Sequence, residues 1–169
     1  MKRVLICVLV VLAAFGLRAV AGPQAASQDR VTWNHISSAS GDLPIPNRGT
    51  EQTSITIGDF GHDGHPGFVL TERTAPDSVV LYRRAGSEWK RTVIEPEPLH
   101  IEAGGVAMDV DGDGNLDYIA AGDWKRNEIW WWRNPYPHLD GRWQRHTIKR
   151  AGSHKHHDQM AAEDRKSVV

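Results

Sequence analysis

The chain repeats itself at a spacing of fifty residues, and this internal repeat constrains the fold more than any other sequence feature. Three pairs of segments align: 57–64 with 107–114, 79–83 with 129–133, and 89–94 with 143–148. The last pair is four residues further apart than the others, because the loop at 134–141 is longer. The repeat therefore predicts a first unit at 51–98 and a second unit at 99–150.

Each unit is predicted to consist of four short strands separated by turn signals. In the second unit the expected strands are 105–108, 117–121, 128–133 and 143–148. Four short strands in about 50 residues is the period of a β-propeller blade, and no long segment shows helical periodicity. We expect an all-β fold of two four-stranded blades with partial flanking strands, and a β-sandwich of two hairpin pairs is the alternative.

The N-terminal residues 1–21 are predicted to be a cleaved export signal. Basic residues precede an apolar run at 4–17, and small residues lead to a predicted cut between Ala21 and Gly22. As a helix the run spans about 21 Å, less than the hydrocarbon core of about 30 Å, so no stable membrane anchor is expected. The sequence thus predicts a secreted protein, periplasmic or extracellular. An N-terminal segment at 22–50 follows, with an orphan strand predicted near 31–36.

Charge and cysteine content argue against nucleic-acid binding and against stabilisation by disulfides. The chain has 20 Lys and Arg against 21 Asp and Glu, a net charge of −1, which leaves no basic surplus for nucleic acid. The only cysteine, Cys7, lies in the predicted signal, so disulfides cannot hold the exported chain. A bound divalent cation is the alternative source of stability.

The loop at 109–117 has the composition of a calcium site. Its oxygen-bearing side chains alternate along the chain: Asp109, Asp111, Asp113, Asn115 and Asp117. Ca²⁺ takes six to eight oxygen ligands, and carboxylates so close together repel one another unless a cation compensates. An EF-hand is excluded, because position 12 of the loop is Ala120 and a strand follows. In the first unit only Asp59 and Asp63 remain at matching positions, which leaves open whether that loop binds calcium.

These runs, followed by an apolar strand and residues 130–135, resemble the FG-GAP/VCBS repeat, the calcium-loop repeat of integrin alpha-subunit propellers and many secreted bacterial proteins. The resemblance covers roughly 51–150. It implies propeller blades with Ca²⁺ in the turn between the first two strands of a blade. It also implies that the five side chains of the second loop are ligands, and that Asp59 and Asp63 match in part.

Two units are fewer than a closed propeller needs, since propellers take typically 4–8 blades. Residues 151–169 are predicted to begin an incomplete third repeat, without the acidic loop that the repeat requires. Two explanations are open. The reading frame is truncated, or the short chain closes its open blade edges by self-association.

Two further features are candidates for chemistry. His154, His156 and His157 form a cluster with metal-ligand character, and Trp124 lies in a loop where it can serve as a ligand platform. The sequence predicts a structural or binding module for a glycan or protein ligand. The alternative is the propeller part of a metal-dependent sugar-acting enzyme, similar to aldos-2-ulose dehydratase.

Overall fold

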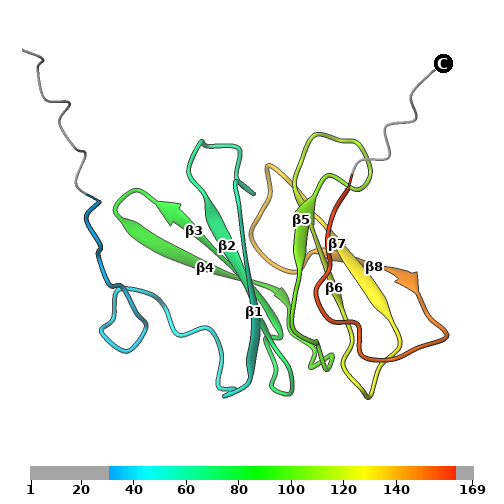
Figure 1. Ribbon diagram of the computed structural model, residues 1–169. Helices are drawn as coiled ribbons and strands as arrows, with labels where there is room; N and C mark the ends of the chain where they lie inside the picture. Colours follow the sequence, from blue (N-terminus) through cyan, green and yellow to red (C-terminus); the bar gives the residue numbers. More distant parts are fainter. Residues whose placement is uncertain (1–30, 163–169) are drawn as a thin grey trace, which may run out of the picture. The chain divides into compact units, whose positions relative to one another are not determined.

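The computed structural model describes residues 31–162, and these residues form eight strands and no helix (Figure 1). The predictions for residues 1–30 and 163–169, including the export signal, lie outside the described residues. By its contacts the chain divides into Met1–Asn34 and His35–Val169, and the eight described strands lie in the second unit. None of the described residues forms a helix with the length and hydropathy that a membrane crossing requires.

The strands form two four-stranded antiparallel sheets, each in simple sequence order. The first sheet contains β1 (Gln52–Gly58), β2 (Gly67–Glu72), β3 (Val79–Ala85) and β4 (Glu88–Glu95). The second contains β5 (Val106–Met108), β6 (Asp117–Ala121), β7 (Ile129–Arg133) and β8 (Gln144–Lys149). The all-β prediction is confirmed, and each strand expected in the second unit is present to within one residue at either end.

The two sheets share one hydrogen-bonding register. Phe68 pairs with Tyr82 in the first sheet, and Tyr118 pairs with Trp132 in the second, so both partners are displaced by fifty. The register shifts at Val79/Val80 and again at Ile129/Trp130, which are also fifty residues apart. Aromatic and β-branched residues dominate these central strands, as a pleated and largely buried surface favours.

The third and fourth strands are joined differently in the two sheets. In the first sheet Ala85 pairs with Glu88, and Gly86 at φ 65° makes the tight turn between them. In the second sheet the loop at 134–143 replaces this hairpin, and the four additional residues fall there. The loop carries Leu139 and Trp143 into the core, where Trp143 lies 6.2 Å from Phe60 between ring centroids.

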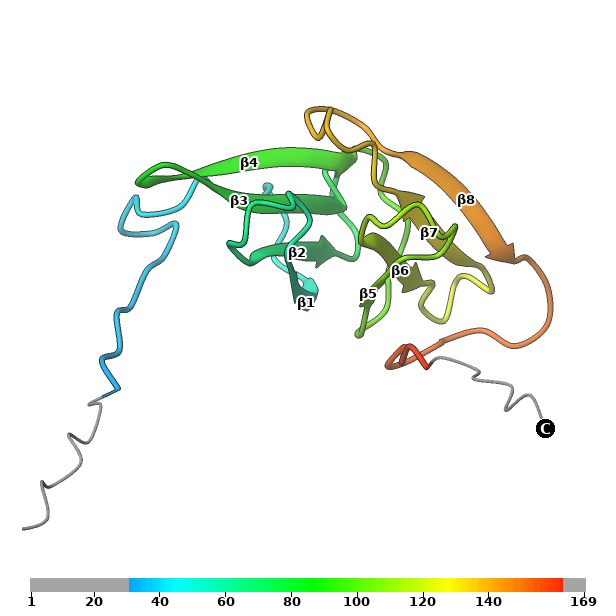
Figure 2. The same ribbon diagram turned by 90° about the horizontal axis from the view of Figure 1, so that it is seen from above.

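The hydrophobic core lies between the facing sides of the two sheets (Figure 2). Its members include Val79, Leu81 and Ile94 from the first sheet and Tyr118 and Trp132 from the second. Trp132 and Tyr118 are fully buried, and a sheet alone cannot bury such side chains. The two sheets therefore depend on each other for stability.

The strand expected near 31–36 is absent, and this prediction is wrong. Residues 31–37 form no strand, and Trp33 and Ile36 are exposed. The following residues instead cover the first sheet: Pro44 O accepts from Tyr82 Oη at 2.6 Å, and Pro46 O accepts from Arg91 Nε at 2.6 Å. Side-chain hydrogen bonds to backbone carbonyls therefore hold residues 44–46 against the first sheet.

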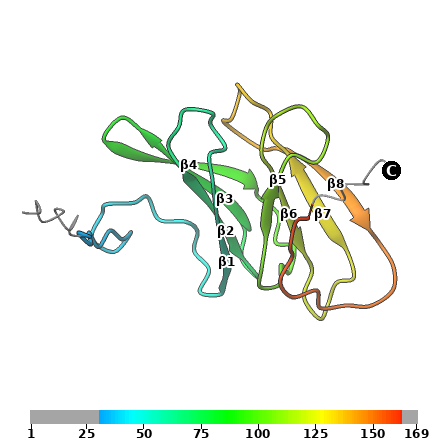
Figure 3. The same cartoon turned by 45° about the horizontal axis from the view of Figure 1, so that its top comes forward.

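The C-terminal residues 151–162 also form no strand. They return across the end of β6, where three backbone N–H groups are bound at 3.2 Å each: Lys155 to Asp123 O, His156 to Gly122 O, and Asp158 to Ala103 O. Figure 3 shows this segment running from β8 back past β5 and β6. It acts as a strap over that end of the second sheet.

Candidate metal centre

The loop between β5 and β6 is folded around Asp109. Its carboxylate accepts hydrogen bonds from Gly112 N at 2.8 Å, Asp113 N at 3.1 Å and Gly114 N at 2.9 Å. Gly112 and Gly114 have φ of 77° and 88°, a left-handed backbone that glycine adopts without steric cost. The sequence therefore winds the loop tightly enough to bring side chains from its two ends together.

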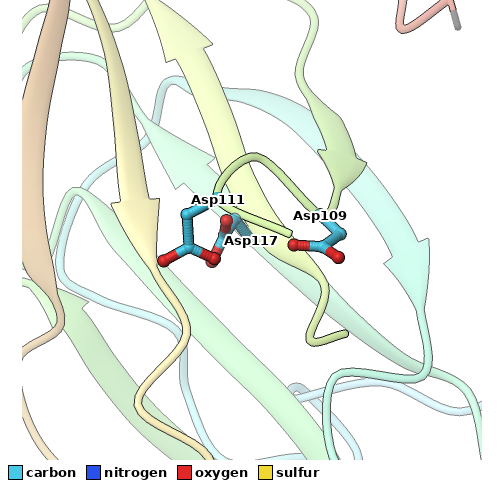
Figure 4. Close-up of side chains that lie close together, drawn as sticks. All are labelled: Asp109, Asp111 and Asp117. Carbon is cyan, nitrogen blue, oxygen red and sulfur yellow. The ribbon is translucent and has the colours of Figure 1, made fainter. Parts of the chain in front are cut away.

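Three carboxylates converge at this loop: ligand atoms of Asp109, Asp111 and Asp117 all lie within 4.8 Å of one another (Figure 4). Asp117, at the start of β6, is fully buried. Its oxygens accept from Val110 N at 3.0 Å and Asn134 N at 2.7 Å, which fixes their direction. The cluster can hold a metal ion, since hard cations take such oxygen ligands.

The electrostatics of the loop favour a cation. Burial raises the pKa of Asp117, and the nearby charges of Asp111 and Asp113 raise it further, against the lowering effect of its two backbone hydrogen bonds. A hydrogen bond from Asn115 N and the neighbouring Arg133 lower the pKa of Asp113. A divalent ion would relieve the repulsion that Asp117 experiences, so ion binding and deprotonation are coupled.

Arg133, which sequence reasoning missed, supplies part of the missing positive charge. Its Nε lies 2.6 Å from Asp111 Oδ2, and its Nη2 lies 3.2 Å from Asp113 Oδ2. The residue ends β7, and antiparallel pairing with β6 brings that end beside Asp117. The sequence signal for this contact was the position of Arg133, a basic residue directly after the three tryptophans at the end of the strand that reaches the acidic loop.

Two of the five predicted ligands lie outside the three-carboxylate group. Asp113 Oδ1 accepts from Asn115 N at 2.9 Å, and its other oxygen faces Arg133. These contacts close the turn, so Asp113 and Asn115 stabilise the loop conformation and do not join the three carboxylates. Asp109, Asp111 and Asp117 are the predicted residues that the fold gathers.

The loop between β1 and β2 has the same backbone design but fewer carboxylates. Asp59 accepts from Asp63 N at 3.2 Å and Gly64 N at 3.0 Å, as Asp109 does fifty residues later. The position matching Asp117 is Gly67, where an added Cβ would lie 2.5 Å from Tyr82 O. A carboxylate cannot be placed there without moving backbone, so this loop lacks the buried ligand of the second.

The two loops lie at the same end of the molecule's two sheets, and Asn134 joins them (Figures 1 and 3). Its Nδ2 donates to Phe60 O and to Leu116 O, both at 3.0 Å. Asn134 is 2% exposed, so these bonds are shielded from water. The metal-site loop is thus anchored to the first sheet as well as to its own.

The predicted histidine cluster is not gathered into a metal centre. Within residues 31–162, the carboxylate trio is the only group of three or more His, Cys, Asp or Glu ligand atoms close enough to share an ion. His156 Nε2 lies 2.7 Å from Lys149 Nζ, and His157 Nε2 lies 3.6 Å from Glu102 Oε1. His154 is exposed. Trp124 is half-exposed in a loop, where sequence reasoning placed it.

No family model, curated protein or solved structure matches this chain. Over residues 31–162 the structure is all-β, with two similar four-stranded antiparallel sheets and an acidic cluster that can hold a metal ion.

Proposed function

We propose that the protein is a calcium-binding repeat module of the β-propeller type, exported from the cell, in which Ca²⁺ stabilises the fold around a ligand-binding scaffold. The observation that carries the proposal is the convergence of Asp109, Asp111 and Asp117 at one turn. The remaining coordination would come from loop carbonyls and water, as is usual for this cation.

Calcium fits the loop better than magnesium. Magnesium demands near-ideal octahedral geometry and dehydrates reluctantly, whereas calcium accepts irregular sets of six to eight oxygens. The three carboxylates come from positions 1, 3 and 9 of one loop and have different burial, which is an irregular set. Arg133 is a competing counter-ion at Asp111, and a bound ion would take over its role there.

The blade interpretation rests on the shared register of the two sheets. Each sheet is a meander of four antiparallel strands, as propeller blades are, and the two pack face to face over one core. Further blades, or a second copy of the chain, would cover the outer faces. The module would present a glycan or protein ligand surface on this scaffold.

The test is thermal unfolding in calcium, in magnesium and in chelator. At a free calcium concentration 100 times the Kd, binding adds about 2.7 kcal/mol to the free energy of unfolding. For a domain of this size that raises the Tm by roughly 10 °C. Asp111→Asn should abolish the rise and preserve the fold, because Asp111 lies on the exposed side of the loop.

Asp140→Asn is the matched control, since Asp140 is an exposed carboxylate paired with Lys90 and Arg83 away from the loop. It should retain the full calcium response. Equal Tm values in calcium and chelator for the unmodified protein would refute the proposal, and an equal response to magnesium would refute the choice of ion.

A further inference from the structure

The end of the sheets opposite the metal-site loop contains two buried carboxylates. Glu102, which precedes β5, is 2% exposed, and Asp123, which follows β6, is 0% exposed. The backbone joins their positions, because Glu102 N donates to Ala121 O at 2.9 Å. The C-terminal strap closes over them, with His157 Nε2 3.6 Å from Glu102 Oε1. Two acids so deeply buried need compensating partners.

The compensation in this cluster is incomplete. Arg73 Nη2 donates to Glu102 Oε1 at 2.6 Å, and Lys125 N donates to Asp123 Oδ1 at 2.8 Å. Among residues 31–162, the second oxygen of each acid, Glu102 Oε2 and Asp123 Oδ2, accepts no hydrogen bond. Arg73 Nε and His100 Nδ1 lie 3.8 and 3.5 Å from Asp123 Oδ2, within ion-pair distance, but donate no hydrogen bond to any described residue. Buried donors and acceptors left in this way indicate a site that takes a further polar molecule.

Arg73 connects the buried acids to an open hollow on the surface. The hollow has a volume of about 530 Å³, and Arg73, Trp124, Ala103 and Gln52 are among the residues that line it. Trp124 is 54% exposed, and the Arg73 guanidinium lies 5.1 Å from the centre of its ring. Asp123 fixes the turn that carries Trp124, through the bond to Lys125 N.

We propose that this hollow binds an uncharged, polyhydroxylated ligand: a sugar ring of a glycan. Trp124 stays 54% exposed although Arg73 lies over its ring, and the exposed part of the ring offers an apolar surface for the C–H side of a pyranose. A hydroxyl group both donates and accepts, which matches unpaired acceptors on Glu102 and Asp123 beside unpaired donors on Arg73 and His100. Arg73, whose side chain is 21% exposed, both lines the hollow and contacts the two acids, so it links the ligand surface to these atoms.

The charges at the site favour an uncharged ligand over an anion or a metal ion. Three carboxylates, from Glu51, Glu102 and Asp123, lie near Arg73, and Lys125 adds a second cation 6.0 Å from the centre of the Trp124 ring, so a small acidic surplus disfavours anions. A metal ion is disfavoured by the guanidinium between the acids. An uncharged ligand is repelled neither by the carboxylates nor by the guanidinium. The inference deepens the ligand-binding part of the proposed function and uses no residue of the metal centre.

The experiment is saturation-transfer-difference NMR with four neutral oligosaccharides as probes: cellotetraose, xylotetraose, mannotetraose and chitotetraose. Tetragalacturonate is the anionic comparison. At least one neutral probe should bind, and Trp124→Ala should weaken it about tenfold, the scale of one lost aromatic contact. Trp124→Phe should restore most of the affinity. Trp33→Ala is the matched control, because Trp33 is 89% exposed and does not line the hollow.

Absence of binding by every neutral probe would overturn the inference, as would binding that Trp124→Ala leaves unchanged or binding of the anionic probe alone. The calcium-dependent Tm is measured on the same samples. If the Tm still rises while no oligosaccharide binds, only the glycan site fails. If Trp124-dependent binding is present without a calcium response, only the cation proposal fails.

Discussion

Asn134 is a buried polar side chain at the junction of the two sheets. It donates from one amide nitrogen to carbonyls on both sides of the junction, Phe60 O in the first sheet's loop and Leu116 O in the second's. Its Oδ1 accepts from Tyr136 N at 3.0 Å. Asn134→Ala would keep the backbone bond from Asn134 N to Asp117 but remove all three side-chain bonds.

The cost follows from which groups remain buried. The Phe60 and Leu116 carbonyls would lose a partner where water has little access, at about 1–3 kcal/mol for each fully buried group. Tyr136 is exposed, so its N–H can bind water instead. We expect a loss of about 3 kcal/mol in the free energy of unfolding, which corresponds to a fall in Tm of roughly 10 °C.

The assay is thermal unfolding followed by near-ultraviolet circular dichroism, which reports the packing of the buried tryptophans. Asn134→Asp is the decisive companion, because it keeps the shape but turns an acceptor toward two carbonyls and buries a charge. It should destabilise the protein at least as much as Asn134→Ala. Asn127→Ala is the control, since its side chain makes no hydrogen bond among the described residues. A Tm for Asn134→Asp equal to that of the unmodified protein would refute the reasoning.

Two further predictions concern the core. Glu95 is fully buried, and its Oε2 accepts from Arg145 Nη1 of the other sheet at 2.6 Å. Glu95→Ala should therefore lower the free energy of unfolding by about 3 kcal/mol, because it leaves the arginine without its buried partner. Glu97→Ala is the control, since Glu97 contacts the same arginine from the exposed side and its loss should leave the Tm unchanged; equal effects of the two substitutions would contradict this. Burial raises the pKa of Tyr118 and Tyr82 to about 12. The stability that they confer is complete below about pH 10 and is lost as the pH rises toward 12, by up to about 1.4 kcal/mol per pH unit for each. Tyrosinate absorbance measures this, and ionisation of both near pH 10 in the folded protein would contradict it.

The strands could be predicted because their signals are local. Turn residues separate short apolar runs, and the repeat allowed each unit to check the other, so that a strand such as Asp117–Ala121 was found to the residue. Near residues 31–36 the same kind of pattern predicted a strand that does not form. A segment whose sequence resembles a strand of the repeat forms a strand only where a neighbouring strand offers a free edge for hydrogen bonding.

The metal centre could be predicted in composition but not in geometry. Alternation along the chain identified the loop, yet it could not distinguish Asp111, which points into the cluster, from Asp113, which closes the turn. The difference lies in the folded loop, where Asp113 Oδ1 accepts from Asn115 N, while Arg133, which strand pairing brings to the loop, contacts both carboxylates. The Glu102 and Asp123 pair could not be predicted either, because these residues lie on different loops and meet only once β5 and β6 have paired.

The close approach of Gly67 to the carbonyl of Tyr82 puts a buried ligand in the first loop out of reach of a single substitution. A Cβ at position 67 would lie 2.5 Å from that carbonyl oxygen, so a carboxylate can be placed there only if the backbones of β2 and β3 separate first. Giving the first loop a third carboxylate would therefore require a change of strand spacing as well as a change of residue.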